Sequence, residues 1–80
     1  MSARLRQLHW RCRRGMQELD IMLRRFADRE LARLSADELR VFAQLLSLPD
    51  PELAALLLRG EQGPDRELNA LAARIAAMAP

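Results

Sequence analysis

Apolar side chains recur along this chain at intervals of three and four residues, which is the spacing of amphipathic helices. The pattern predicts five helices joined by short connections. The first runs from about Ser2, a candidate N-cap, to about Arg13. Its apolar stripe is narrow and consists of Leu5, Leu8 and Cys12.

The second predicted helix begins near Met16, after Gly15 interrupts the pattern, and fades near Leu34. Its apolar positions follow the i, i+3, i+4, i+7, i+8 template of a helix that packs on a core. These positions are Leu19, Met22, Leu23, Phe26 and Ala27.

A capping box predicts the start of the third helix. The Ser35 hydroxyl can accept from the amide three residues later, and the Glu38 carboxylate can reach back to the Ser35 amide. Leu34 and Leu39 stand at the two positions of a hydrophobic staple. The predicted buried face of this helix consists of Leu39, Phe42, Ala43 and Leu46.

The pair Asp50-Pro51 predicts the start of a fourth helix, with Asp50 as N-cap and Pro51 as the first helical residue. Gly60 predicts its end. Its inner face is predicted to be Leu53, Leu56 and Leu57.

A turn at Gly63-Pro64 precedes the fifth helix, for which Asp65 is the predicted N-cap. Leu68, Leu71, Ala72 and Ile75 line its inner face. The helix is expected to fray at residues 78–80.

Composition favours an all-α fold. Half of the 80 residues are apolar, but the chain has no Tyr, one Trp and two Phe. Val41 is its only Val, and Ile21 and Ile75 are its only Ile. Strands favour β-branched and aromatic residues, whereas Leu, Ala and Met favour helices. We therefore predict one all-α domain over residues 1–80, without a second domain.

The distribution of charge indicates an anionic partner without specifying its kind. Residues 1–14 contain five Arg and no acid, and the remainder contains eight Arg against eleven acids. Lys is absent, so every basic side chain is a guanidinium that can form forked contacts to carboxylate or phosphate. The single cysteine favours a reducing compartment. No apolar run approaches the roughly 18 residues of a membrane span, and no secretory signal is recognisable, so we expect a cytoplasmic protein without membrane insertion.

The candidates for catalysis are weak, and we predict that the chain is not an enzyme. His9 and Cys12 stand one helical turn apart, and such a pair can activate a thiolate. However, Cys12 lies on the apolar stripe and is better explained as a small buried hydrophobe. Structural zinc needs four Cys or His ligands and only two exist, so no metal site is expected.

Residues 9–20 form the most informative segment. Trp10 lies off the apolar stripe, and an exposed Trp among Arg is typical of binding hot spots. Gly15 breaks the helix and lets another backbone come close. Glu18 follows Arg14 by four residues, and the two can pair if the turn is tight. The residues alone allow two interpretations equally: a structural corner between helices, or a docking surface.

This segment resembles the signature of the SdhE family, the bacterial flavinylation factors of succinate dehydrogenase. The hallmark is Arg-Gly-x-x-Glu, here Arg14, Gly15 and Glu18, within the run Trp10-x-Cys12-Arg13-Arg14-Gly15-Met16-x-Glu18-Leu19-Asp20. The resemblance continues in order through the later helices, with Leu56 where relatives often carry Trp.

The resemblance implies a compact five-helix bundle that binds the flavoprotein subunit of succinate dehydrogenase or fumarate reductase. It implies that this binding promotes covalent attachment of FAD to the client, with no cofactor held stably by the chain itself. Arg14 is expected to fork onto a client carboxylate, carbonyl or flavin phosphate, and Glu18 to orient Arg14 or meet a client donor. Gly15 is expected to permit close approach of the client. The rest of the expected partner-binding patch is Trp10, Arg11, Arg13, Met16 and Asp20.

Two alternatives remain. One is a nucleic-acid binder that uses the Arg-rich first helix, which we consider less favoured because the rest of the chain is net acidic. The other is an antitoxin-like partner of a small membrane toxin, a role also proposed within the family. We expect a monomer that binds no nucleic acid.

Overall fold

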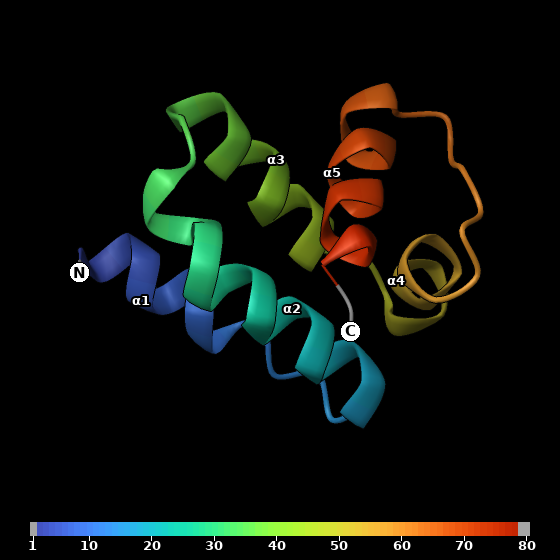
Figure 1. Ribbon diagram of the computed structural model, residues 1–80, viewed down its shortest axis with the longest axis horizontal. Coiled ribbons are helices and arrows are strands. Elements are labelled where there is room, and N and C mark those ends of the chain that lie inside the picture. The colour runs from blue at the N-terminus through green and yellow to red at the C-terminus, as the bar shows by residue number, and fades with distance from the viewer. Residues whose placement is uncertain (1, 79–80) are drawn as a thin grey trace.

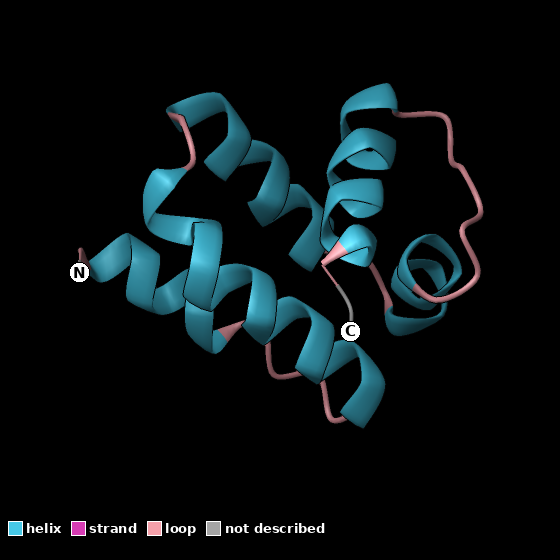
Figure 2. Cartoon of the chain, viewed as in Figure 1, coloured by secondary structure: helices cyan, strands magenta, loops and turns pink. Residues whose placement is uncertain are grey.

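Five α-helices and one 3-10 turn make up the computed structural model, which describes residues 2–78 (Figure 1). The elements are α1 (Ala3–Trp10), α2 (Gln17–Glu30), η1 (Leu31–Arg33), α3 (Ala36–Leu46), α4 (Asp50–Leu57) and α5 (Arg66–Ala77). Helices and loops account for all of residues 2–78, with no strand among them (Figure 2). The predicted all-α bundle is therefore confirmed.

Side-chain caps begin three of the helices as the sequence predicts. The Ser2 hydroxyl accepts from the Leu5 amide at 3.1 Å. At α3 both halves of the capping box form, because Ser35 accepts from the Glu38 amide at 3.1 Å and Glu38 accepts from the Ser35 amide at 2.9 Å. Asp65 accepts from two amides in the first turn of α5. Each cap satisfies amides that have no partner within the helix.

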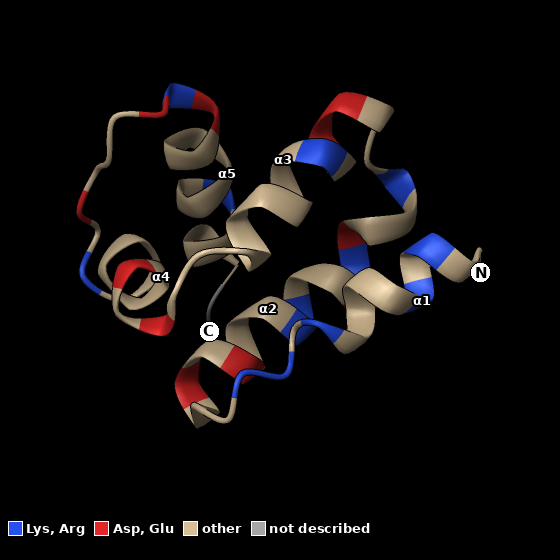
Figure 3. Ribbon diagram, turned by 180° about the vertical axis from the view of Figure 1, so that it is seen from behind, with Lys and Arg blue, Asp and Glu red and all other residues tan. Residues whose placement is uncertain are grey.

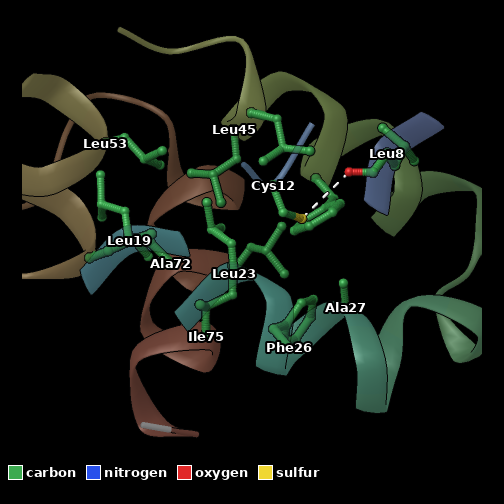
Figure 4. Packing of buried hydrophobic residues seen from close by; sticks show 14 of the residues in the cluster. Leu8, Cys12, Leu19, Leu23, Phe26, Ala27, Leu45, Leu53, Ala72 and Ile75 are labelled. Atoms are coloured by element: carbon green, nitrogen blue, oxygen red, sulfur yellow. Dashed lines mark hydrogen bonds between the residues drawn. The ribbon is translucent and has the colours of Figure 1, made fainter. Parts of the chain in front are cut away.

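One apolar core holds the helices together, and α5 packs against α2, α3 and α4. Side chains from α1, α2, α3, α4 and α5 meet there (Figure 4). Phe26 of α2 and Phe42 of α3 are fully buried, with ring centroids 5.6 Å apart. Tilted aromatic pairs at this distance contribute about 0.5–1.5 kcal/mol beyond their burial.

The buried face of α3 is wider than predicted. Val41 and Leu45 are buried, whereas Leu39 and Ala43 are only partly so. The reason is that α3 has two neighbours. Phe42 faces α2, while Val41 lies beside Leu71 of α5. A single narrow stripe describes a helix with one neighbour, so it omitted part of this face.

Two predicted helix boundaries are wrong. The first helix ends at Trp10 and not near Arg13, because the chain turns there. Asp50 is not the N-cap of α4. It is the first residue of that helix, Pro49 is the N-cap, and no side chain caps the helix. The carboxylate of Asp50 has another partner, described below.

The last predicted boundaries agree closely with the structure. The fourth helix ends at Leu57, and the backbone at Gly60 is left-handed with φ +67°. The fifth ends at Ala77, and the predicted fraying at residues 79–80 lies outside the described residues. In residues 2–78 no helix has both the length and the apolar content to cross a membrane.

Candidate docking surface at the corner between α1 and α2

The corner, residues 10–20, joins α1 to α2 through a tight non-helical turn. Its first part is closed by backbone hydrogen bonds from Cys12 to His9 at 3.2 Å and from Arg13 to Trp10 at 3.1 Å. Cys12 is fully buried and anchors the turn to the core. The segment after it runs outward again before α2 begins at Gln17.

Arg14 fastens this turn to the other side of the bundle. Its guanidinium donates from Nε to Asp50 Oδ1 at 2.9 Å, from Nη1 to the carbonyl of Leu46 and from Nη2 to the carbonyl of Leu48. Only 16% of the side chain is exposed. All three of its nitrogens have partners within the chain, so this geometry favours a brace over the expected fork onto a client, which stays a prediction.

Arg11 makes a second link of the same kind. Its Nη2 donates to the carbonyl of Ala43 at 3.3 Å and to Ser47 Oγ at 3.0 Å. The two arginines thus supply donors to the C-terminal end of α3. This end needs them, because α3 has no basic residue in its last turn and basic side chains there satisfy free carbonyls and offset the helix dipole.

Asp20 supports the corner from α2. Its Oδ1 accepts from the backbone amide of Arg14 at 2.6 Å, and the side chain is half-buried. It therefore fixes the turn from within, whereas the sequence suggested a place on the outer patch. The predicted pairing of Glu18 with Arg14 is also wrong, because the ion-pair partner of Arg14 is Asp50.

Gly15 follows this fastened residue and faces outward. Its φ is +83°, a conformation that residues with a side chain rarely adopt. A Cβ built at this position would meet no atom within 4 Å. The turn therefore requires a glycine here because of its positive φ, and not because a side chain would lack space. The space above Gly15 is open.

Four other predicted site residues of the corner have exposed side chains. Trp10 is 67% exposed, with the Arg13 guanidinium 4.8 Å from its ring centroid. Met16 is 37% exposed. Glu18 is exposed, and its carboxylate forms no hydrogen bond or ion pair with any residue in the range 2–78. The corner thus divides the eight predicted site residues. Trp10, Arg13, Gly15, Met16 and Glu18 face solvent, and Arg11, Arg14 and Asp20 hold the turn.

Cys12 and His9, the candidate catalytic pair, each form a hydrogen bond with a different residue. The Cys12 thiol donates to the carbonyl of Leu8 at 3.4 Å, and burial, followed by the charges of Asp28 and Asp20, raises its pKa to about 12. A thiol in this environment is a poor nucleophile. His9 Nε2 lies 2.6 Å from Asp28 Oδ1 and links α1 to α2. No group of three or more metal-ligating side chains occurs within residues 2–78.

Sequence reasoning did not identify the side chains that accept hydrogen bonds from Arg11 and Arg14. Asp50 and Ser47 stand 36 positions after Arg14 and Arg11 respectively, so no local pattern pairs them. One signal was available. The sequence after Leu46, Ser47-Leu48-Pro49, lacks the Gly or basic residue that often completes a helix C-terminus.

Together these features define a small all-α protein with an exposed, internally braced corner and, in its described part, no group of three or more metal-ligating side chains. A family model described as flavinator of succinate dehydrogenase matches residues 6–79. The FAD assembly factor SdhE of Legionella pneumophila (strain Paris) is 45% identical over 62 residues, which cover 78% of this chain and 77% of that protein. The protein of the same name from Coxiella burnetii is 47% identical over 53 residues, 66% of this chain and 65% of that protein. The one from Photorhabdus laumondii is 44% identical over 62 residues, 78% and 70% of the two chains.

The chain belongs to the family of succinate dehydrogenase flavinators. This confirms the resemblance seen in the sequence. The matched range includes the whole corner and all five helices except the first residues of α1.

Proposed function

We propose that this chain is a cytoplasmic, non-catalytic FAD assembly factor that binds the flavoprotein subunit of succinate dehydrogenase, or of fumarate reductase. Binding promotes covalent attachment of FAD to a histidine of that client. FAD belongs to the client in this proposal, and the assembly factor acts as a monomer that contributes protein contacts alone. Membership of the flavinator family and the names of the relatives support this function.

The observation that carries the proposal is the open space above Gly15 on a corner braced from within. Gly15 has no side chain, so a client backbone can reach the corner directly. The residue before it is held twice, because the Arg14 amide donates to Asp20 at 2.6 Å and the Arg14 guanidinium donates to Asp50 at 2.9 Å. A braced surface loses little conformational entropy on binding, which favours affinity.

The outward side chains supply complementary contacts. Trp10 offers a large amphipathic ring stiffened by Arg13 beside it, and such residues dominate binding energies at interfaces. The Glu18 carboxylate is free to accept from a donor on the client. Arg14 acts as a positioning residue, because it shapes the corner without reaching the client.

Binding can accelerate flavinylation without a nucleophile on this chain. A partner that binds one client conformation more tightly raises the population of that conformation. If the favoured conformation holds the flavin and the client histidine in reacting geometry, each 1.4 kcal/mol of differential binding increases the rate about tenfold. No residue of this chain needs to take or give a proton.

Complementation of a gene deletion tests the proposal. Covalent flavin is measured by in-gel fluorescence of the flavoprotein, with the wild-type chain, Gly15→Arg, Gly15→Asn and Glu18→Arg supplied in turn. Asn tolerates a left-handed backbone better than other non-Gly residues, so Gly15→Asn is the matched control for strain in Gly15→Arg.

We expect the deletion to lose covalent flavin, the wild-type chain to restore it, and Gly15→Arg and Glu18→Arg to fail while remaining helical by circular dichroism. Gly15→Asn should restore more flavin than Gly15→Arg. Undiminished fluorescence in the deletion strain would contradict the function. Full activity of both Gly15→Arg and Glu18→Arg would contradict the corner as the docking surface.

A further inference from the structure

An open groove lies between α4, the loop of residues 58–65 and the start of α5, away from Gly15 and Trp10. Its volume is about 450 Å³, within the range of sites that bury a ligand or a large side chain. Five apolar residues line it. These are Leu48, Ala55, Leu56, Pro64 and Leu68.

The outer wall of the groove is preformed although it is not helical. Asn69 Oδ1 accepts from the Gly63 amide at 2.9 Å, and Asn69 Nδ2 donates to the Gly63 carbonyl at 2.8 Å. The Glu61 amide donates to the carbonyl of Ala55 in α4 at 3.0 Å. The loop is thus tied to both helices that flank the groove, so the groove need not open before it is filled.

The rim of the groove is acidic. Glu52, Glu61 and Asp65 line it, and none of the 13 arginines does. Arg59 neutralises Glu61 at 2.7 Å, and Asp65 accepts from amides of α5. Glu52 is exposed and has no ion-pair partner in residues 2–78. An apolar floor under uncompensated negative charge favours a partner that is both apolar and cationic.

The groove continues from the braced side of the corner. Leu48 lines it, and the carbonyl of the same residue accepts from Arg14. Figure 3 shows acidic residues at the start of α2 and of α4, and arginines on α1 and on the segment that joins α1 to α2, besides others on α2, α3 and α5. A partner seated on Glu18 therefore meets further negative charge in the direction of the groove.

We propose that the groove receives an apolar side chain from a Lys- or Arg-bearing segment of the client flavoprotein, as a second docking site beside the corner. This inference rests on the proposed function, because it takes the client to be the protein that binds the corner. The opposite charges on the groove and on such a segment select it over an anionic lipid surface or a nucleic acid, which the carboxylates repel.

Affinity measurements with the purified flavoprotein subunit test the inference. Glu52→Lys reverses the uncompensated charge, and Ala55→Met fills the floor with a helix-compatible side chain. Glu67→Lys is the matched control. Like Glu52, Glu67 is an exposed acid in the first turn of a helix, but it does not line the groove. Titration calorimetry at two salt concentrations gives the dissociation constants, and circular dichroism verifies folding.

We expect Glu52→Lys and Ala55→Met each to weaken binding about tenfold, and Glu67→Lys to change it less than twofold. The loss caused by Glu52→Lys should shrink at high salt. If the wild-type chain binds the client and both groove variants match Glu67→Lys, the groove inference fails and the proposed function stands. If the wild-type chain does not bind the flavoprotein, both fail. Sedimentation that shows self-association abolished by Glu52→Lys would assign the groove to a second copy and overturn the inference.

Discussion

Replacement of Arg14 by Ala tests whether this side chain stabilises the fold or contacts the client. In the structure the guanidinium donates three hydrogen bonds, one to the Asp50 carboxylate, one to the carbonyl of the last residue of α3 and one to a carbonyl just after it. A hydrogen bond to a charged group contributes about 1.5–3 kcal/mol when it is buried. With 16% of Arg14 and 39% of Asp50 exposed, water replaces part of what is lost. We therefore expect Arg14→Ala to cost about 2–3 kcal/mol in total.

Thermal unfolding followed by circular dichroism measures this loss. For a domain of this size, 1 kcal/mol shifts the melting temperature by about 4–8 °C, so the expected decrease is roughly 10–20 °C. Asp50→Asn should cost about 1 kcal/mol, since it keeps an acceptor but removes the charge. The double variant with Arg14→Ala should cost less than the sum, because the two residues share one contact.

Arg13→Ala is the matched control one residue away. Its guanidinium is exposed over Trp10, a contact of about 0.5–1 kcal/mol. A loss below about 0.5 kcal/mol for Arg14→Ala would refute the brace. Unchanged stability together with weakened client binding would restore the interpretation of Arg14 as a contact residue.

Three further predictions follow from the remaining contacts. Cys12 is the side chain that titrates between pH 9 and 12, because the chain has no Lys or Tyr. Its pKa is raised to about 12 in the folded state, so the free energy of unfolding is at its full value below pH 9 and falls above it, by up to about 1.4 kcal/mol per pH unit. Cys12→Ala should remove this slope in alkaline denaturation. The hydrogen bond from the Ser35 amide, followed by the one from Arg74, lowers the pKa of Glu38. The ionised Glu38 therefore contributes to the stability of the fold above pH 4.5, and this contribution is lost below that pH. Arg74→Gln should raise the pKa of Glu38 measured by NMR. Trp10 is the only tryptophan and is exposed, so its fluorescence should be that of a hydrated indole and shift to shorter wavelength when the client is added; a blue-shifted free protein would contradict the docking surface.

Local sequence signals predicted the elements of this fold well, because each signal acts within one helical turn. The Ser35–Glu38 capping box and the Asp65 cap are contacts over two or three residues. The apolar stripe at Leu19 and Leu23 reflects one helix packed on one core. Contacts of this range depend on helical geometry alone, so the pattern and the structure agree.

The division of the corner into outward and inward residues was beyond such reasoning. A guanidinium suits a client carboxylate and the free carbonyls at the end of α3 equally well. Which of them Arg14 meets depends on where α3 ends in space, 32 or more residues later in the chain. For the same reason Asp50, which has the sequence position of a cap, accepts a hydrogen bond from Arg14 instead of capping α4.

At Gly15, the backbone conformation and the open space above it are separate properties with separate costs. The φ of +83° imposes a strain of about 1–2 kcal/mol on a residue with a side chain. The absence of any atom within 4 Å means that the protein itself adds no clash to this cost. A substituted chain therefore remains mostly folded unless its stability is already marginal. If Gly15→Arg abolishes flavinylation at a temperature where the variant is folded, we attribute the loss to contact between the new side chain and another molecule, because a Cβ at this position has open space around it.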